Sequence, residues 1–242
     1  MCGQHQSAVA RLPTLVADCS AYALHRRTPI VVVGITGSSR SGKSWLSKEL
    51  SKCLLLPHGA VVEQDRFWRR SSIVQTADGR RMVSEDEPEC TDSDAFLDAI
   101  RCAISEAQPL AGCDWGCVIV EGFQLLHDKR VVALLDHIFL LDLSKEELLS
   151  RRTAPWSDLN RNPANEDYCK LVVWPAHERY MQTKVQPLGE WPSGRVRRFE
   201  PPTTAEDVAS IVSTIERHIE VVQRQRQDKL VRRSLCPFSP NG

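Results

Sequence analysis

The chain has 242 residues, of which 42% are hydrophobic, and this is enough for one α/β domain with a full core. Its 31 Lys and Arg residues balance its 31 Asp and Glu residues, so the net charge of zero argues against a broad nucleic-acid-binding or membrane-binding surface. No apolar run approaches the roughly 20 residues that span a bilayer. The nine cysteines are odd in number and have no paired spacing, which favours reduced thiols in a reducing compartment. We therefore expect a cytoplasmic protein with no nucleic-acid or membrane partner.

Two terminal segments lie outside the predicted domain, which covers residues 29–223. Residues 1–28 form an N-terminal extension with three arginines and the single acid Asp18, a composition that leaves organelle targeting open. Residues 224–242 form a basic tail that we expect to be disordered.

Strand and helix patterns alternate along the predicted domain. The β-branched run Ile30–Ile35 predicts a strand that is buried on both faces, and apolar residues at helical spacing predict a helix over Gly42–Leu55. The later elements follow in chain order: strand Ala60–Glu63, helix Ser93–Ala107 with Ser93 as its N-cap, strand Cys117–Glu121, strand His137–Leu143, a helix from about Ser144 to Arg152, strand Arg195–Phe199 and helix Thr204–Val222. Such alternation predicts right-handed βαβ crossovers and a parallel sheet with helices on both faces.

Two segments between these elements are candidates for flexible functional loops. The first is Arg66–Asp92, and the second is Thr153–Asp167, which is rich in Asn, Pro and Asp and is predicted to form a lid. The helix before the lid begins with a capping box, because Glu147 follows Ser144 by three residues.

A phosphate-binding pattern lies between the first strand and the first helix. The pattern G-x-x-x-x-G-K-[ST] falls on Gly37, Gly42, Lys43 and Ser44. Backbone N–H groups of such a loop converge on an anion, and the following helix directs its positive dipole end at the same point. Lys43 is expected to reach the β- and γ-phosphates, and the Ser44 hydroxyl to bind Mg²⁺. The full predicted nucleotide-binding set is Gly37, Ser38, Ser39, Arg40, Ser41, Gly42, Lys43, Ser44 and Trp45.

Two carboxylates follow strands whose carboxyl ends meet at the same edge of the sheet. Asp65 can accept the proton of a substrate hydroxyl that attacks the γ-phosphorus, or it can simply cap a turn. Glu121 has the position of an acid that holds Mg²⁺ directly or through water, or it faces solvent at a strand end. The candidate metal residues are Ser44, Asp65 and Glu121.

Arginines and tryptophans flank the predicted crevice. Arg151 and Arg152 end the helix before the lid, where they either clamp transferring phosphate oxygens or complement the helix dipole. Trp68 and Trp156 either stack on a flat base or pack in the core and the lid.

Five stretches together resemble one family, the nicotinamide riboside kinases, which are relatives of the uridine–cytidine kinases. They are Gly34–Ser44, Val62–Trp68, Val118–Phe123, Ile138–Thr153 and Tyr168–Pro175, and the Val-Trp-Pro of the last stretch favours the nicotinamide riboside kinases. The resemblance covers about Pro29 to Val222. It implies a P-loop NTPase-type, three-layer α/β fold with a parallel five-stranded sheet and a small lid. It also implies ATP- and Mg²⁺-dependent phosphorylation of the ribose 5′-hydroxyl of nicotinamide riboside. The sequence leaves open whether the protein is a monomer or a homodimer.

The resemblance also implies roles for particular residues. Asp65 matches the catalytic base, and Asp86 matches a ribose-binding aspartate. Arg151 and Arg152 match the lid-helix arginines, and Trp156 lies near an aromatic residue that stacks on nicotinamide. The complete predicted catalytic and substrate-binding set is Lys43, Asp65, Phe67, Trp68, Asp86, Arg151, Arg152 and Trp156.

Three positions depart from the family pattern. Arg66 replaces a second acid, Glu85 replaces an aromatic residue, and Ala154-Pro155 replaces a lid arginine. The first two positions adjoin the nucleoside pocket, so a uridine–cytidine-type or other small-metabolite kinase remains the alternative enzyme. A catalytically degenerate kinase is a further alternative. A GTPase-type switch is disfavoured, because no Asn is followed by Lys and no Asp has Gly three residues later.

Overall fold

The computed structural model describes residues 29–154, 165–201 and 203–235. The N-terminal extension 1–28, most of the predicted lid with Trp156, and residues 236–242 lie outside the described residues.

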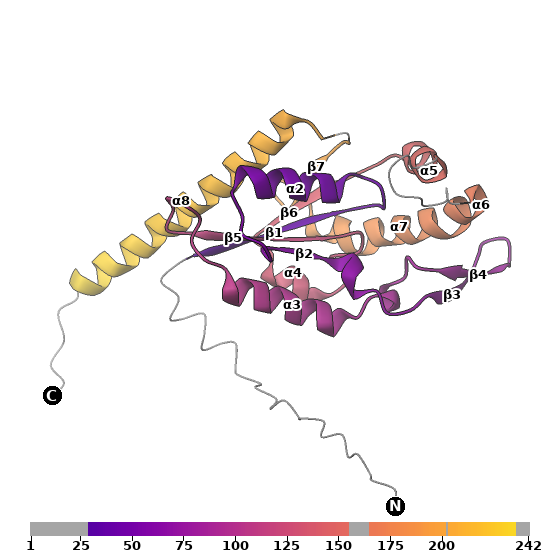
Figure 1. Ribbon diagram of the computed structural model, residues 1–242, viewed down its shortest axis with the longest axis horizontal. Helices are drawn as coiled ribbons and strands as arrows, with labels where there is room; N and C mark the ends of the chain where they lie inside the picture. Colours follow the sequence, from indigo (N-terminus) through magenta and orange to yellow (C-terminus); the bar gives the residue numbers. More distant parts are fainter. Residues whose placement is uncertain (1–28, 155–164, 202, 236–242) are drawn as a thin grey trace, which may run out of the picture.

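Five parallel strands form the central sheet, which confirms the predicted fold class (Figure 1). In spatial order they are β2 (Val61–Glu63), β5 (Gly116–Gly122), β1 (Ile30–Gly37), β6 (His137–Leu141) and β7 (Val196–Phe199). Strand β1 pairs over Ile30–Thr36 with β5 and over Val33–Gly37 with β6. The central position of β1 explains its uninterrupted apolar run, because neither of its faces meets water.

Helices cover both faces of the sheet. Helices α2 (Lys43–Cys53) and α8 (Ala205–Leu235) pack on the face that receives Val31, Val33 and Ile35. The other face carries these helices: α3 (Ser93–Glu106), α4 (Lys129–Leu134) and α7 (Trp174–Tyr180). Alternate residues of one strand therefore enter two separate cores, as the period-2 geometry of a strand requires.

Some boundaries differ from the sequence expectations. Helix α3 is capped by Asp92, whose side chain accepts a hydrogen bond from the Ala95 amide, so Ser93 is not its N-cap. Helix α5 (Lys145–Thr153) is capped by Ser144 as predicted. Helix α8 continues past Val222 to Leu235, so the first part of the segment expected to be a disordered tail is helical.

Two structures fill segments that the sequence analysis left without regular elements. A hairpin of β3 (Ser72–Gln75) and β4 (Arg81–Ser84) lies within the first predicted flexible loop, flanked by the 3₁₀ turns η1 (Gln64–Phe67) and η2 (Pro88–Cys90). Residues 166–188 form one nearly continuous helical stretch: α6 (Glu166–Tyr168), the π-helical η3 (Cys169–Val173), α7, the π-helical η4 (Met181–Val185) and the 3₁₀ turn η5 (Gln186–Leu188). None of the helices described is both long and apolar enough to cross a membrane.

Candidate active site

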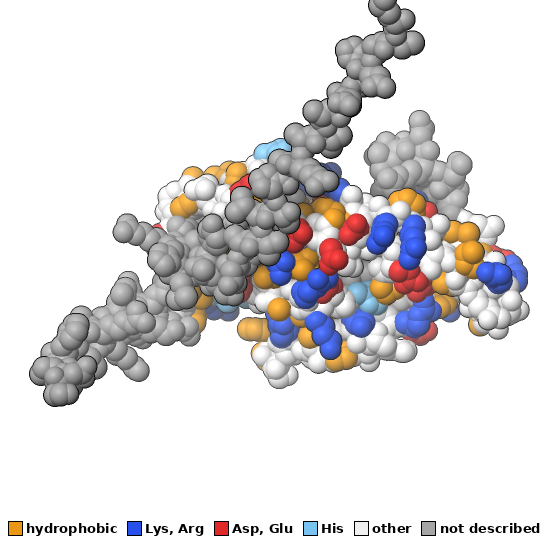
Figure 2. Space-filling model, turned by 90° about the horizontal axis from the view of Figure 1, so that it is seen from below, with side chains coloured by type: hydrophobic (Ala, Val, Ile, Leu, Met, Phe, Trp, Pro, Cys, Tyr) orange, Lys and Arg blue, Asp and Glu red, His pale blue; other side chains and the backbone are white. Residues whose placement is uncertain are grey.

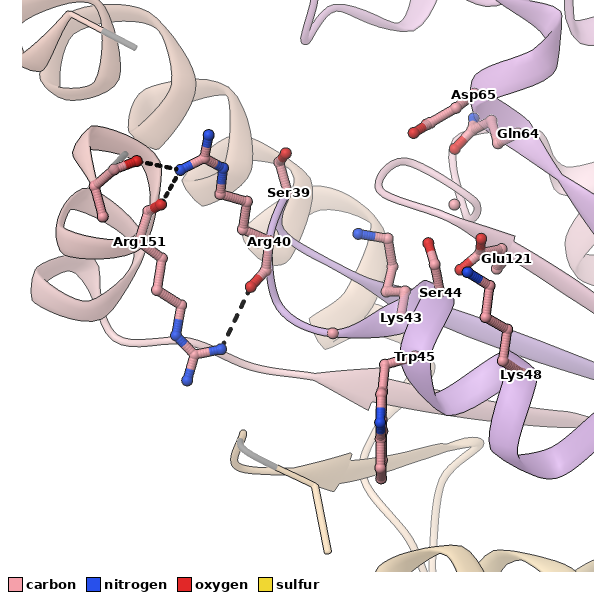
Figure 3. Close-up of a pocket in the computed structure, with 13 residues that line it drawn as sticks. Ser39, Arg40, Lys43, Ser44, Trp45, Lys48, Gln64, Asp65, Glu121 and Arg151 are labelled. Carbon is pink, nitrogen blue, oxygen red and sulfur yellow. Dashed lines mark hydrogen bonds between the residues drawn. The ribbon is translucent and has the colours of Figure 1, made fainter. Parts of the chain in front are cut away.

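A cavity of about 640 Å³ opens at the carboxyl ends of the central strands (Figure 3). It brings together the loop after β1, the turn after β2, the end of β5 and the end of α5. Its lining residues are Ser39, Arg40, Gly42, Lys43, Ser44, Trp45, Lys48, Gln64, Asp65, Glu121, Gly122, Arg151 and Ala154. The predicted phosphate loop and the two predicted carboxylates thus face one space.

The phosphate loop depends on backbone conformations that glycine adopts easily. Gly37 has φ +146°, and a Cβ atom there would lie 2.2 Å from the Leu141 carbonyl oxygen. Gly42 has φ +100° and directly precedes α2. The Lys43 ammonium donates a hydrogen bond to the Ser38 carbonyl, with 2.8 Å between the heavy atoms. Because the ammonium is buried, the pKa of Lys43 is lowered, although Asp65 and Glu121 oppose this shift. A phosphate bound by this loop would lie next to the Lys43 ammonium.

The neighbourhood of Glu121 fits a divalent cation. Glu121 is only 5% exposed, and its Oε2 atom has no hydrogen-bond partner among the described residues. Burial raises the pKa of this carboxyl, while a hydrogen bond with Ser44 and the charge of Lys43 oppose the rise. A buried carboxylate oxygen without a partner beside a hydroxyl is the hard oxygen donor set that Mg²⁺ prefers. These two residues would hold the ion, with Lys48 next to them (Figure 3).

Asp65 owes its direction to the turn that follows β2. Its neighbour Gln64 is buried and accepts a hydrogen bond from the Gln124 amide at 3.0 Å, so Gln64 anchors the turn. Asp65 is exposed and extends into the cavity above the Lys43 and Ser44 side chains (Figure 3). The carboxylate therefore faces the space in front of the phosphate loop.

The two arginines at the end of α5 point to different places. Arg151 lines the large cavity and donates to the Arg40 carbonyl at 3.3 Å. In return, the Arg40 guanidinium donates to the Arg151 and Ala154 carbonyls (Figure 3), which links the phosphate loop to the end of α5. Arg152 turns instead toward Asp86, with 4.0 Å between the charged groups. The sequence could not separate the two, because both fit a helix C-terminus equally well.

Asp86 does not line the large cavity; it lines a smaller one together with Ser38 and Ser39 of the phosphate loop. It is 9% exposed, and Tyr168 donates to its carboxylate at 3.5 Å. Burial raises the pKa of Asp86, and the charge of Arg152 opposes the rise. This smaller cavity shares Ser39 with the large one, so the two spaces adjoin; its other lining residues are Ser38, Phe123, Gln124, Val173, His177 and Tyr180.

The remaining predicted residues occupy other surroundings. Phe67 packs on Phe96 with 5.3 Å between the ring centroids, and Trp68 is 54% exposed; neither lines the two cavities. Sequence reasoning missed Lys48 and Gln64 as cavity residues. Lys48 could have been predicted, since it lies one helical turn after Ser44 and therefore on the same side of the helix. Gln64 could not, because its inward direction depends on the conformation of the turn after β2.

Together, the β2-β5-β1-β6-β7 parallel sheet, the glycine-rich loop after β1 and the two carboxylates define a P-loop kinase. Curated relatives agree with this class. The chain is 28% identical over 158 residues to nicotinamide riboside kinase 1 of Homo sapiens, covering 62% of this chain and 76% of the relative. It is 25% identical over 172 residues to a uridine kinase of Clostridium botulinum, covering 63% and 82%. The chain is a phosphotransferase related to the nicotinamide riboside kinases and uridine kinases.

No protein-family model matches the chain. Among solved structures, a gluconokinase from Sinorhizobium meliloti is similar over 83% of this chain and 99% of its own, with 18% identity and a TM-score of 0.47. A shikimate kinase from Aquifex aeolicus is similar over 77% and 96%, with 13% identity and a TM-score of 0.43.

Proposed function

We propose that this protein transfers the γ-phosphoryl group of ATP, with Mg²⁺, to the ribose 5′-hydroxyl of nicotinamide riboside and so forms nicotinamide mononucleotide. The observation that carries this proposal is the shared cavity of Asp65 and the phosphate loop, which provides for a hydroxyl beside a terminal phosphate. The choice of nucleoside is supported by the similarity to the human nicotinamide riboside kinase.

Each step of the transfer has a residue in this cavity. Asp65 accepts the proton of the attacking hydroxyl, and Lys43 with the loop amides stabilises the negative charge on the transferring phosphoryl oxygens. Ser44 and Glu121 would hold Mg²⁺, which neutralises phosphate charge when bound. Arg151 adds positive charge at the far side of the loop.

The acceptor sugar would be held at Asp86. The Asp86 carboxylate can accept hydrogen bonds from two vicinal hydroxyls, and Arg152 beside it opposes the rise in the pKa of Asp86 that burial causes and can donate to the same sugar. The Asp86 cavity and the phosphate cavity share Ser39 as a lining residue, and the Asp86 cavity, at about 10 Å³, would have to widen for a ribose to reach both.

A uridine–cytidine-type kinase is the second candidate. Several curated relatives are uridine kinases at 23–29% identity, close to the identity with the nicotinamide riboside kinases. Glu85 and Arg66 also depart from the nicotinamide riboside kinase pattern next to the nucleoside pocket.

Competition among four acceptors tests the proposal. Purified protein is incubated with ATP and Mg²⁺ and equal amounts of nicotinamide riboside, nicotinic acid riboside, uridine and cytidine, and mass spectrometry measures the products. The Lys43→Ala variant, prepared in parallel, reports any contaminating kinase. We expect nicotinamide mononucleotide as the main product. Phosphorylated uridine or cytidine without nicotinamide mononucleotide would establish the second candidate, and no product at all would favour a degenerate kinase.

A further inference from the structure

The large cavity has two ends, which lie on opposite sides of the phosphate loop. Figure 3 shows Asp65 at one end, Lys43, Ser44 and Glu121 in the middle, and the side chains of Trp45 and Arg151 at the other end. Phosphoryl transfer requires the terminal phosphate of the donor to face the proton acceptor. The rest of the donor must therefore leave the loop toward Trp45 and Arg151.

Trp45 combines an exposed ring with a place in the lining of the large cavity. It is the third residue of α2, directly after the predicted Mg²⁺ ligand Ser44, and its side chain is 45% exposed at the cavity wall. Large aromatic side chains normally bury their rings, and an exposed ring beside a charged cavity marks a surface that a flat ligand can cover. The helix N-terminus supplies the phosphate site, while the indole supplies an apolar face one residue further on.

Arg151 limits the same space from the direction of α5. Its guanidinium is held by the Arg40 carbonyl at 3.3 Å and by Glu147 at 3.5 Å, and the side chain keeps 30% of its surface exposed. A planar guanidinium stacks on flat π-systems as an indole does. The described wall at this end thus offers an indole ring and a planar cation to whatever leaves the phosphate loop.

We propose that the nucleobase of the triphosphate donor stacks on the Trp45 indole, with the Arg151 guanidinium beside it. This inference rests on the proposed use of a nucleoside triphosphate and adds the residue that recognises its base. A ring face accepts adenine and guanine alike, because stacking does not read the hydrogen-bonding edge of a base. Trp45 therefore contributes to donor affinity without choosing between the two purines.

The test compares donors with and without a base. The dissociation constants of Mg-ATP, Mg-GTP and Mg-tripolyphosphate are measured by calorimetry for the wild type, Trp45→Ala and Trp45→Phe. A matched control is Trp191→Ala, since Trp191 is 57% exposed but lines neither of the two cavities. We expect Trp45→Ala to weaken ATP and GTP by a similar factor of about tenfold or more, because stacking contributes about 1–3 kcal/mol per base. Tripolyphosphate binding should not change, Trp45→Phe should recover most of the loss, and Trp191→Ala should behave as the wild type.

Two results would overturn the inference. An equal loss of ATP and tripolyphosphate in Trp45→Ala would assign Trp45 to the shape of the loop, and unchanged ATP binding would remove it from the donor site. In either case a wild type that still phosphorylates nicotinamide riboside leaves the proposed function intact. A wild type that binds none of the three donors would overturn the inference and the proposed function together.

Discussion

Asp65 and Glu121 are both carboxylates at strand ends, yet the fold gives them different surroundings. Glu121 is buried at the end of a central strand, where burial raises its pKa and one oxygen has no hydrogen-bond partner. Asp65 is exposed on a 3₁₀ turn after the edge strand β2. A fixed, buried oxygen suits a metal ion, whereas an accessible carboxylate suits proton transfer to and from a substrate.

The first prediction concerns Asp65. We expect Asp65→Asn to lower kcat at least about a hundredfold, because a positioned general base contributes roughly 10²–10⁴ to the rate. The free energy of unfolding should change by less than about 0.5 kcal/mol, since the residue is exposed. Steady-state kinetics and urea denaturation measure the two effects, and Glu63→Gln, two residues earlier at the end of β2 and outside the cavity lining, is the control. Turnover close to that of the wild type would remove Asp65 from the mechanism.

The second prediction separates the cost of a positive φ at Gly37 from the cost of the steric clash that a Cβ atom would cause there. Both Gly37 and Gly59 have positive φ, at +146° and +92°, so an alanine at either position is strained. Only at Gly37 does the new Cβ meet backbone, 2.2 Å from the Leu141 oxygen, whereas nothing lies within 4 Å at Gly59. Gly37→Ala should therefore lower the free energy of unfolding by at least about 2 kcal/mol more than Gly59→Ala. Urea denaturation measures the free energy of unfolding of both variants. Equal losses would show that the backbone around Gly37 accommodates the Cβ atom with no additional loss of stability.

At the scale of elements, the helical stretch 166–188 was the main failure of the sequence analysis. Two π-helical segments, Cys169–Val173 and Met181–Val185, interrupt its α-helical hydrogen bonding. Each extra residue per turn shifts the apolar positions out of the 3.6-residue period, so a search for that period finds no helix. The hairpin β3–β4 was missed for a different reason. Its strands have four residues each, and only one of these residues is buried, so the sequence carries little strand pattern.

The third prediction tests how this stretch is fixed to the sheet. Tyr180 is fully buried, and its hydroxyl lies 2.7 Å from the Thr36 hydroxyl on β1 and accepts a hydrogen bond from the Leu126 amide at 3.2 Å. Tyr180→Phe leaves that amide without this partner, so we expect a loss of about 1–3 kcal/mol in the free energy of unfolding. Tyr168→Phe is the matched control, because Tyr168 is only half-buried and its hydroxyl lies 3.5 Å from the Asp86 carboxylate, so its loss should cost less. Equal losses in the free energy of unfolding, measured by urea denaturation, would contradict the role of the Tyr180 hydroxyl in fixing this stretch to the sheet.

For the whole molecule, the sheet and the cavity at the phosphate loop could be predicted from the sequence pattern, whereas the direction of Arg152 toward Asp86 could not. The order of strands and helices, a glycine-rich loop after the first strand and acids after the next two were sufficient to place Gly37–Ser44, Asp65 and Glu121 at one edge. Strand periodicity and βαβ handedness depend on local sequence. The direction of Arg152 toward Asp86 depends on how α5, the hairpin and α6 meet, and no local pattern encodes that meeting.

The last prediction concerns stability in acid. His137 lies at the start of β6, its ring centroid 4.8 Å from that of His218 on α8, and burial together with His218 lowers the pKa of His137 to about 4. In the unfolded chain the pKa of a histidine is about 6.5, so between pH 6.5 and 4 the unfolded state binds the extra proton. The stability that His137 contributes is therefore complete above pH 6.5 and is lost as the pH falls toward 4.

His127 and His177, with pKa values also lowered to about 4, act in the same direction, whereas Asp86 and Glu121, whose pKa values are raised, act against it. The pH dependence of the wild type alone would thus combine opposing contributions. Comparison with His137→Gln isolates one of them, because the other groups are common to both proteins. Thermal unfolding at pH 7 and pH 5 should show a smaller drop in Tm for His137→Gln than for the wild type. Equal drops would mean that His137 accepts a proton in the folded protein as readily as in the unfolded chain, which its half-buried position beside a second histidine should prevent.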